Sequence, residues 1–537
     1  MALRQLWIIS LVAVCVLADD DATVTLQQGT LRGKHIVFLG QKLEVYLGIP
    51  YAEPPVGNLR FKKPVPARPW NSVLDATEIK PGCMQGKIPG FGSVKGTSED
   101  CLFVNVWSPG KGETLKTVMV WIHGGGFNFG SSYEDWYNGT VLAATADVVV
   151  VTLNYRLGLF GFLTARTTAA PGNMGLYDQA LALQWVQENI EAFGGNPEKV
   201  TLFGESAGSM SVHAHIISPL SQRLFHRAIM MSGNLYAGLM EGADEMVRRS
   251  NNFARHVGCA TLREDFSTQS DDVLQCLRSR PAEELQAEYD HFELRFIKKM
   301  MPIFNDEFVP VAPCLAITSG LLKNVDVMSG VTKDEGAFAF ILQPDKRIAE
   351  EDLQHVGEEE LENVLRSVMQ DWLHEVSATL WKHYEKDINP STWKTDFRKA
   401  SSNYITDIMF KCPNKLFSDR LLNAGPKLFS YVFGHRSDVS HFPKWAGAPH
   451  TSDIFYVFGL PLLYPEQYTE DDRQLSRDFM KMASTFAKEG VPMLPTEEKW
   501  PEYTAEDPLS IYMKAGNFTP VKPADLDICD LWQEHVC

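Results

Sequence analysis

The sequence predicts an α/β fold in which helices flank a central, mostly parallel sheet. Residues 118–122 and 148–153 form continuous apolar runs, the second rich in β-branched side chains, which is typical of strands buried on both faces of a sheet. Between 176 and 193, apolar residues recur every three or four positions and indicate a helix that leads into a third strand at 200–203. This alternation of strands and helices is the pattern of a parallel α/β sheet.

The second half of the chain is more helical than the first. Residues from about 350 to 384 place acidic and apolar side chains at helical spacing, and strands are expected at 325–331 and 428–433. Each of these strands precedes a polar stretch in which functional groups can lie. No repeat, low-complexity segment or linker divides the 537 residues, so we expect a single domain over residues 19–537.

The N-terminal residues have the features of a secretory signal peptide. Arg4 precedes an apolar run at 6–17, and small residues come before Asp19, so cleavage is expected after Ala18. The run is shorter than the ~20 residues of a membrane span, which disfavours an uncleaved anchor. No later stretch is apolar enough to cross a bilayer, and the C-terminal residues carry neither a retention signal nor a lipid-anchor tail. We therefore expect a secreted, extracellular protein without a membrane anchor.

The chain is acidic, with a formal net charge of −17. This charge argues against nucleic acid as a partner, because phosphate binding requires a basic face. An acidic surface can steer cationic substrates, but it also keeps a secreted protein soluble.

Nine cysteines are spread along the chain, and the first lies inside the predicted signal peptide. The other eight lack the close Cys/His spacing of a zinc site, so disulfides are favoured in an oxidising compartment. The loops Cys83–Cys101 and Cys259–Cys276 are plausible local bridges, each contributing about 3 kcal/mol of stability. Two N-glycosylation sequons, which agree with a secretory route, begin at Asn138 and Asn517.

Ser206 is the candidate nucleophile. It lies in the motif Gly204–Gly208 (GESAG), between the strand at 200–203 and the start of a helix. A hydroxyl is a poor nucleophile at neutral pH unless a nearby base takes its proton. The small residues around Ser206 allow a tight, strained turn that lifts its oxygen above the sheet.

A run of glycines supports this interpretation independently. His123-Gly124-Gly125-Gly126 follows the strand at 118–122, and glycines let backbone N–H groups face a developing oxyanion. The expected donors are the amides of Gly125, Gly126 and Ala207. A phosphate-binding loop is the alternative, but no GKS or GKT follows and no GxGxxG is formed.

In folds of this class the acid and the histidine follow the nucleophile in the chain. Glu335 is the most suitable acid, and Asp334 competes with it on spacing. Three histidines follow the strand at 428–433 and compete for the role of base; residue types and spacing alone do not choose among them. They are His435, His441 and His450.

Four long motifs resemble those of the type-B carboxylesterase/cholinesterase family, and the resemblance covers nearly the whole chain after the signal peptide. The motifs are LGIPYAEPPVGNLRF (Leu47–Phe61), EDCLFVNVW (Glu99–Trp107), FGGNPEKVTLFGESAG (Phe193–Gly208) and SPLSQRLFHRAIMMSG (Ser218–Gly233). The resemblance implies an α/β-hydrolase fold and the triad Ser206, Glu335 and His450. His450 is chosen because the stretch from 448 to 453 before IFYVFG is similar to the family's histidine loop. The implied oxyanion hole is Gly125, Gly126 and Ala207.

The implied chemistry is hydrolysis of a small-molecule carboxylic ester in two steps. His450 takes the proton of Ser206 as its oxygen attacks the ester carbonyl, and Glu335 orients and stabilises the imidazolium. The alcohol leaves, and water activated by His450 then hydrolyses the acyl-enzyme. No metal or organic cofactor is required.

The resemblance also bears on the cysteines. It implies the pairs Cys83–Cys101, Cys259–Cys276 and Cys412–Cys529, and it leaves Cys314 and Cys537 unassigned. Because dimers in the family pack helices near the C-terminus, a homodimer linked through Cys537 is one interpretation, and a frayed tail with an unpaired thiol is the alternative.

Three substrate-pocket candidates are similar to residues of the cholinesterase branch. Glu205 lies beside the nucleophile, and Tyr137 would support it. Phe338 matches an aromatic residue of the choline pocket, with ordinary core packing as the alternative. One departure concerns the Cys83–Cys101 loop, which lacks the tryptophan that holds a quaternary ammonium in that branch and contains Phe91 as its one aromatic residue. A desolvated cation–π contact contributes about 2 kcal/mol or more. We therefore expect a general carboxylesterase with weak or absent choline selectivity.

The alternative is a catalytically weak or non-enzymatic relative that binds esters or serves in adhesion. Such members typically lack the serine or another triad residue. All three triad candidates are present in this sequence, which favours an enzyme.

Overall fold

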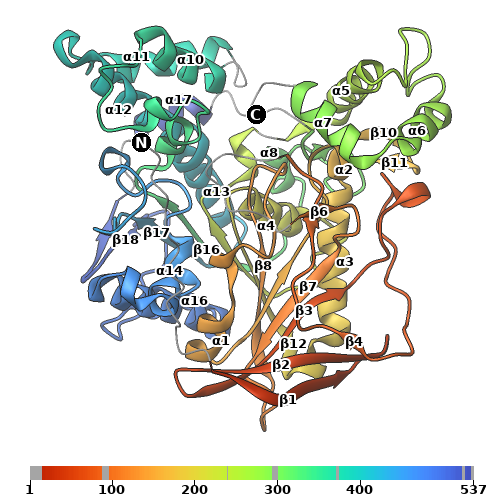
Figure 1. The fold of residues 1–537 in the computed structure, drawn as a ribbon. Helices are drawn as coiled ribbons and strands as arrows, with labels where there is room; N and C mark the ends of the chain where they lie inside the picture. The colour runs from red at the N-terminus through yellow and green to blue at the C-terminus, as the bar shows by residue number, and fades with distance from the viewer. Residues whose placement is uncertain are drawn as a thin grey trace.

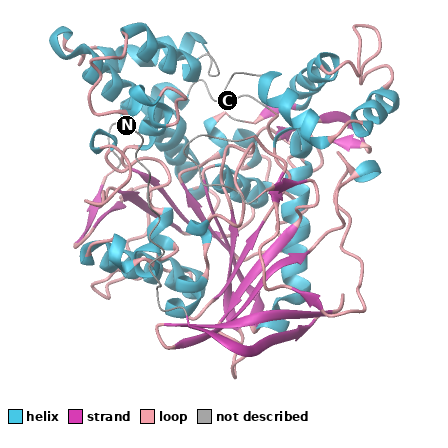
Figure 2. Cartoon of the chain, viewed as in Figure 1, coloured by secondary structure: helices cyan, strands magenta, loops and turns pink. Residues whose placement is uncertain are grey.

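The computed structural model describes residues 15–86, 96–238, 240–292, 300–369, 374–522 and 526–533. A large sheet crosses the middle of the structure (Figure 1), and helices cover both of its faces (Figure 2). This architecture confirms the predicted α/β class. Helices α10–α12 with α17 and helices α5–α7 form two groups at the upper corners of Figure 1, and α4 lies between the groups.

In the described part of the chain, the main sheet has the strand order β1-β2-β3-β7-β9-β8-β12-β13-β16-β17-β18-β19, with β4 beside β2. The strands from β9 to β18 in this order are parallel, whereas both edges of the sheet are antiparallel. The strand bounds are β1 (Cys15–Thr25), β2 (Thr30–Phe38), β3 (Gln41–Pro50), β4 (Leu74–Asp75), β7 (Phe103–Ser108), β8 (Lys116–Ile122), β9 (Val149–Leu153), β12 (Gly195–Glu205), β13 (Arg227–Met231), β16 (Asp326–Thr332), β17 (Leu428–Phe433), β18 (Ser510–Lys514) and β19 (Asn517–Val521).

Short strand pairs and helices complete the structure. The pairs are β5 (Gly82–Cys83) with β6 (Thr97–Ser98), β10 (Thr164–Thr167) with β11 (Ala170–Pro171), and β14 (Glu241–Gly242) with β15 (Ile303–Phe304). The helices are α1 (Thr140–Ala146), α2 (Gly158–Phe162), α3 (Met174–Asn189), α4 (Ala207–Ile217), α5 (Ala243–His256), α6 (Ser270–Ser279), α7 (Ala282–Phe292), α8 (Pro313–Ala316), α9 (Phe338–Ile341), α10 (Glu358–Met369), α11 (His374–Glu385), α12 (Trp393–Thr406), α13 (Cys412–Leu422), α14 (Ile454–Val457), α15 (Leu460–Leu463), α16 (Glu470–Glu489) and α17 (Leu526–Gln533).

Alternate residues of the central strands enter two separate cores, one on each face of the sheet. In β8, Val118 and Val120 pack into the core that contains the apolar side of α3 and α4, while Met119 and Trp121 pack into the core that contains α14 and α16. All four side chains are fully buried. Burial on both faces explains why these strands are continuous apolar runs rather than alternating ones.

The expected strands are all present, and β12 is longer than expected. The helix expected over 176–193 is α3, continued by a 3₁₀ turn at Ile190–Phe193. The prediction of helix from residue 350 is wrong at its start, because residues 350–357 form turns and α10 begins after them. Leu353 and Val356 are buried within these turns, so their spacing reflects core packing rather than a helix.

Strand β1 begins at Cys15, ahead of the predicted mature N-terminus. Its pairing with β2 becomes regular from Asp21 to Thr25, after an irregularity between Val16 and Asp21. The regular part therefore lies within the predicted mature chain. Cleavage after Ala18 and the single-domain limits of 19–537 stay predictions.

Three disulfides confirm the implied pairs: Cys83–Cys101, Cys259–Cys276 and Cys412–Cys529. Cys314, which the resemblance left unassigned, is also disulfide-bonded. Cys537 and Phe91 lie outside the described residues. Among the helices that the structure describes, none is long and apolar enough to cross a membrane.

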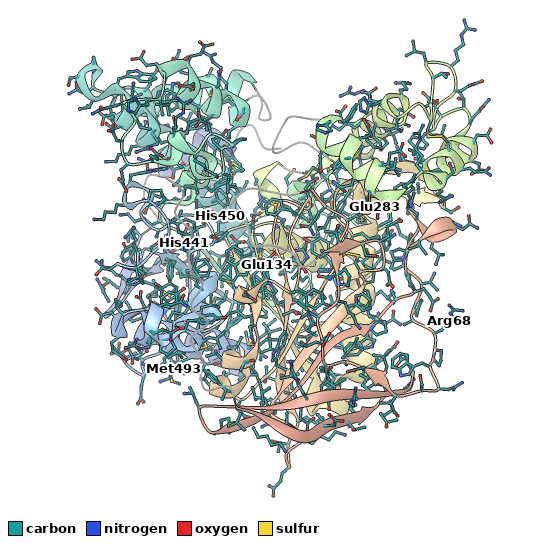
Figure 3. All side chains as sticks on the ribbon, viewed as in Figure 1. Arg68, Glu134, Glu283, His441, His450 and Met493 are labelled. Carbon is teal, nitrogen blue, oxygen red and sulfur yellow. A yellow bond between two sulfur atoms is a disulfide. The ribbon has the colours of Figure 1, made fainter. Side chains whose placement is uncertain are left out.

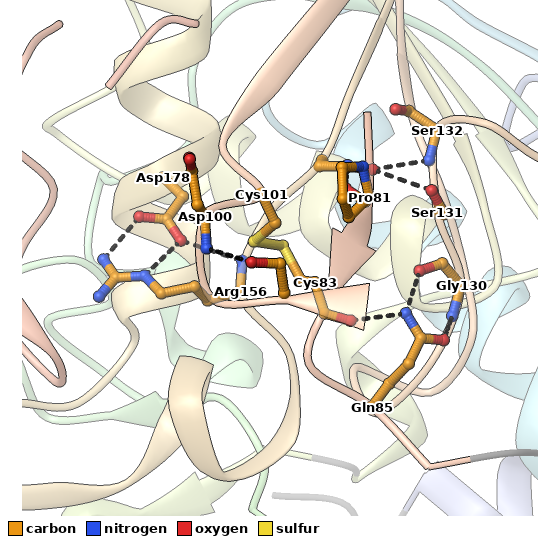
Figure 4. Close-up of a disulfide and its surroundings, with 12 residues drawn as sticks. Pro81, Cys83, Gln85, Asp100, Cys101, Gly130, Ser131, Ser132, Arg156 and Asp178 are labelled. Atoms are coloured by element: carbon orange, nitrogen blue, oxygen red, sulfur yellow. Dashed lines mark hydrogen bonds and ion pairs between the residues drawn. A yellow bond between two sulfur atoms is a disulfide. The ribbon is translucent and has the colours of Figure 1, made fainter. Parts of the chain in front are cut away.

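A buried ion pair braces the start of α3, and a partly buried one braces the base of the first disulfide loop. Arg156 donates to both carboxylate oxygens of Asp178 at 2.6 and 2.8 Å, and its backbone N–H donates at 3.0 Å (Figure 4). Arg60 makes a similar two-point contact with Glu99, at 2.6 Å for each bond. Breaking such a pair by removing one partner leaves an uncompensated charge in the interior.

We expect Asp178→Asn to destabilise the protein by about 3–5 kcal/mol, because the Arg156 guanidinium would stay buried without its countercharge. Denaturant unfolding of the disulfide-intact protein measures the change. The matched control is Glu362→Gln in the exposed pair with Arg366 on α10, which is expected to cost less than about 0.5 kcal/mol. Equal losses of stability in the two variants would contradict the role given to the buried pair.

Candidate active site

The turn between β12 and α4 holds Ser206 in a strained conformation. Its backbone has φ 57° and ψ −123°, and its N–H donates to the carbonyl of Met231 at 2.9 Å. A Cβ at Gly208 would lie 2.0 Å from the carbonyl oxygen of Ile122, and a Cβ at Gly204 would lie 2.6 Å from the backbone of Gly208. The motif therefore needs glycine at both positions, and Ser206 stays partly exposed at the apex of the turn.

His450 and Glu335 lie together although they are far apart in the chain. Nδ1 of His450 is 2.6 Å from Oε2 of Glu335, and Oε1 of Glu335 accepts the N–H of Thr332 at 2.6 Å. Glu335 is fully buried and follows β16, while His450 follows β17 and lies toward the middle of the molecule (Figure 3). A buried carboxylate in this position orients the imidazole so that Nε2 is left for chemistry.

The competing residues have other partners. Nε2 of His435 is 2.8 Å from Asp472 at the start of α16, and His441 packs its ring against Phe442. Asp334 accepts the N–H of Ala448 at 3.0 Å and donates its own N–H to the carbonyl of Ala448 at 3.1 Å. Asp334 thus ties the loop that carries His450 to the loop that carries Glu335, and among the described contacts none joins it to the imidazole.

Glu205 occupies the other side of the imidazole. Its Oε1 lies 3.1 Å from Nε2 of His450, and its side chain is buried. Burial raises the pKa of Glu205 to about 8, against the opposing effect of His450. Burial also lowers the pKa of His450, but the carboxylates of Glu205 and Glu335 outweigh it and raise that pKa to about 9. Within the described residues, no hydrogen bond joins the hydroxyl of Ser206 to His450; such bonds often tighten only when substrate binds.

A third acid, Asp453, was not singled out from the sequence. It is fully buried at the start of α14 and accepts the hydroxyl of Tyr431 at 2.9 Å. Burial, reinforced by Glu335, raises its pKa to about 7. The available signal was an acidic residue three positions after His450, directly before an apolar stretch.

The carbonyl groups of the glycine run have hydrogen-bond partners, and these partners set the direction in which its amides point. Nδ1 of His123 lies 2.8 Å from the carbonyl of Gly124, and the carbonyl of Gly125 accepts the N–H groups of Asn128 and Phe129, both at 3.0 Å. In a trans peptide the next N–H points opposite to the carbonyl, so the amides of Gly125 and Gly126 point away from these partners. Burial lowers the pKa of His123 to about 4, which keeps the ring neutral.

These amides lie beside the candidate nucleophile. A Cβ at Gly124 would be 3.1 Å from Cβ of Ser206, which places the glycine run against the turn after β12. The amides of Gly125 and Gly126 make no hydrogen bond within the part of the chain that the structure describes. Ala207 opens α4, where a helix leaves its first N–H groups unpaired. The three predicted donors are therefore available to an oxyanion.

Aromatic side chains cover His450. The ring of Phe338 lies 5.4 Å from the imidazole, and that of Phe410, which the sequence reasoning missed, lies 4.7 Å away. Phe410 belongs to a π-helical turn at Asp407–Lys411, and such turns are frequent at functional sites. Tyr137 packs against Trp121, and no hydrogen bond joins it to Glu205 in the described structure. Burial and, second to it, the charge of Glu205 raise the pKa of the Tyr137 hydroxyl, and the predicted support of Glu205 by Tyr137 stays a prediction.

The assembled groups are suited to acyl transfer. A partly exposed hydroxyl, an imidazole held by a buried carboxylate, and free N–H groups meet beyond the carboxyl ends of the parallel strands. Among the described residues there is no cluster of three or more His, Cys, Asp or Glu side chains that could hold a metal ion. The residues present are those that a nucleophile, a base and an anion-binding site require.

Comparison with known proteins agrees with this chemistry. A family model described as "Carboxylesterase family" matches residues 20–525. A curated relative, the acetylcholinesterase of Bungarus fasciatus, is 36% identical over 98% of this chain and 88% of its own length.

We expect Glu205→Gln to move the acid limb of the pH profile of ester cleavage to lower pH. His450 must be uncharged to accept a proton, and an ionised Glu205 raises the pKa of the imidazole. The amide keeps the size of the side chain and removes this effect. The pH dependence of kcat/KM reports the base of the free enzyme and measures the change.

Glu134→Gln is the matched control for this experiment. Glu134 is another carboxyl whose pKa is raised by burial, and its charge acts on Tyr137 rather than on His450. The acid limb of the pH profile of the Glu134→Gln variant is expected to stay in place. A limb that stays in place in Glu205→Gln as well, or that moves to higher pH, would show that Glu205 does not influence the base.

Proposed function

The chain belongs to the carboxylesterase family, and from this premise we propose that it is a secreted serine esterase that acts through an acyl-enzyme on Ser206. Ester hydrolysis as the general activity follows from the family and from the acetylcholinesterase relative. The observation that carries the finer proposal is the 2.6 Å contact between His450 and Glu335 next to the strained turn of Ser206. No metal or organic cofactor enters the proposed reaction.

In the first step, His450 accepts the proton of the Ser206 hydroxyl while the oxygen attacks the ester carbonyl. The negative charge that develops on the carbonyl oxygen is stabilised by the amides of Gly125, Gly126 and Ala207. Glu335 stabilises the imidazolium, which returns its proton to the leaving alcohol. In the second step, water loses a proton to His450 and attacks the carbonyl of the acyl-enzyme. The carboxylic acid leaves, and His450 returns the proton to the oxygen of Ser206.

A catalytically weak ester-binding protein is the second candidate function. The observation that favours it is the position of Nε2 of His450, which is 3.1 Å from Glu205 while no hydrogen bond to Ser206 is present among the described contacts. A base held in this way can form the acyl-enzyme and then turn it over slowly.

Replacing Ser206 by alanine is expected to abolish ester hydrolysis and covalent labelling by an organophosphate. Removal of the nucleophile of a triad typically lowers kcat by about 10⁶-fold. Mass spectrometry locates the label, and the alanine variant should remain folded because Ser206 is partly exposed.

Time courses of the unmodified protein separate the two functions. An esterase shows steady turnover, whereas the weak ester-binding protein shows a stoichiometric burst without it. Labelling of the alanine variant, or hydrolysis by it at the normal rate, would rule out Ser206 as the nucleophile.

For the substrate, we propose uncharged carboxylic esters with weak or absent choline selectivity. The support is the sequence of the Cys83–Cys101 loop, which has no tryptophan for a quaternary ammonium. The relative at 36% identity is named an acetylcholinesterase, so its name favours the opposite preference. Of the pocket candidates, Glu205 and Phe338 lie against His450, whereas Tyr137 packs against Trp121.

The expected result is a kcat/KM for acetylthiocholine close to that for an uncharged thioester of equal acyl length. A lost cation–π contact of about 2 kcal/mol corresponds to roughly a thirty-fold change. Release of thiol measures both substrates in the same assay, so the leaving-group chemistry is matched. A value for acetylthiocholine that is well above the uncharged thioester would contradict the proposal.

Extracellular location is proposed with the same enzyme. The three disulfides fit an oxidising compartment. Of the two sequons, Asn517 is exposed on β19, whereas Asn138 is half-buried and Thr140 is buried, so Asn517 is the better glycan site. A homodimer through Cys537 stays a prediction, because this residue lies outside the described structure.

A further inference from the structure

We propose that Asn128 and Tyr289 are positioning residues that hold the glycine run in the shape needed for oxyanion binding. The inference deepens the proposed function, since it concerns the same oxyanion site. Neither residue was singled out by its sequence pattern.

The glycine run is strained where it turns toward Ser206. Gly125, Gly126 and Phe127 have φ values of 104°, 57° and 59°, so three consecutive residues lie in the left-handed half of φ space. Phe127 is not a glycine, and such a conformation persists only where the surroundings hold it. Its side chain is fully buried beside Phe162, and its carbonyl accepts the N–H of Gly158 at 2.7 Å.

Packing does not hold Gly126. Gly126 is exposed, and a Cβ placed on it would meet no described atom within 4 Å. The restraint comes from Asn128 instead: its Nδ2 donates to the carbonyl of Gly126 at 2.7 Å. The backbone N–H of the same residue donates to the carbonyl of Gly125, so Asn128 fixes two successive peptide planes.

Tyr289 fixes the amide of Asn128 in turn. Its hydroxyl donates to Oδ1 of Asn128 at 2.9 Å and accepts the backbone N–H of Met300 at 2.6 Å. Tyr289 is 2% exposed on α7, which makes it a rigid support. Because its proton goes to Oδ1, the amide of Asn128 must turn Nδ2 toward Gly126. A Cβ at Gly158 would lie 2.9 Å from the ring, so the support is closely packed.

The consequence concerns the N–H of Gly126. This N–H belongs to the peptide plane between Gly125 and Gly126, which the backbone N–H of Asn128 holds through the carbonyl of Gly125. The side chain of Asn128 holds the following plane through the carbonyl of Gly126. Without the side-chain bond, the strained plane after Gly126 is free to relax, and the N–H is no longer kept in line with the oxyanion position. A donor that is misplaced stabilises the transition state less, while binding of the ground-state ester is barely changed.

The test compares Asn128→Ala, Asn128→Asp and Tyr289→Phe. The aspartate keeps the size and the acceptor for Tyr289 but loses the donor to Gly126. Losing a whole oxyanion donor costs about 10²–10³-fold in kcat, and we expect a displaced donor to cost about 10- to 100-fold in both Asn128 variants, with KM nearly unchanged. Tyr289→Phe should show a smaller loss of the same kind.

A second readout separates positioning from general damage to the fold. A trifluoromethyl ketone adds to Ser206 and places an oxyanion in the hole, so its affinity should fall in parallel with kcat/KM. Affinity for the product carboxylic acid, which forms no such adduct, should stay within about twofold. The control is Asn389→Ala, an exposed asparagine that caps a 3₁₀ turn at Pro390–Thr392 and should leave kcat and the ketone affinity as they are.

Failure of this inference is distinguishable from failure of the proposed function. If Ser206→Ala abolishes activity while the Asn128 variants keep the normal kcat and ketone affinity, the positioning role is wrong and the esterase stands. A rise in KM with unchanged ketone affinity overturns it as well. Should Ser206→Ala remain active, the proposed function itself fails.

Discussion

Parallel strands buried on both faces determine where every reactive group of this protein lies. The glycine run follows β8, Ser206 follows β12, Glu335 follows β16 and His450 follows β17. These strands are parallel, so all four groups lie beyond the carboxyl ends of the strands, on one side of the sheet. In the register of the sheet, Gly204 lies opposite Ile122 of β8 and Met230 of β13. The turn that carries Ser206 therefore begins beside the segments that follow these two strands. A slip of one residue would turn each buried side chain to the wrong core, so the two cores that fix the register also fix the site.

Burial then determines which of the acidic and basic groups at these strand ends can be charged. Three acids, Glu205, Glu335 and Asp453, surround one imidazole, and the interior disfavours the ionised forms of Glu205 and Asp453. Burial raises the pKa of Glu205 and of Asp453, so these two are partly neutral near pH 7. Elsewhere in the interior, the cost of burying a charge is offset by an opposite charge, as between Arg156 and Asp178. The site differs in that its cation is an imidazole, which can give up its proton during a reaction.

The sequence was most informative where a local pattern sufficed. Continuous apolar runs marked β8 and β9, and the motif around Ser206 required glycines for contacts that a Cβ would block. The histidine could not be chosen locally, because His435 and His450 both follow β17 and differ only in partners that are distant in the chain. The family resemblance made that choice, and the structure places His450 against Glu335. Phe410 and the Asn128–Tyr289 pair were missed for the same reason; the bond between Asn128 and Tyr289 spans 161 positions. Asp453 was missed although it lies close to His450 in the chain, because no local pattern shows that it is buried.

Gln85 links the first disulfide loop to the segment after the glycine run (Figure 4). Its amide donates to the carbonyls of Cys83 and Gly130, both at 2.9 Å, and accepts the N–H of Gly130 at 2.8 Å. All three bonds lie at the base of the loop, next to the cysteine that closes it. Gln85 therefore couples the described start of the loop to the segment that follows the glycine run. A change in how the loop leaves Cys83 would thus be transmitted mechanically to the backbone beside the candidate oxyanion site.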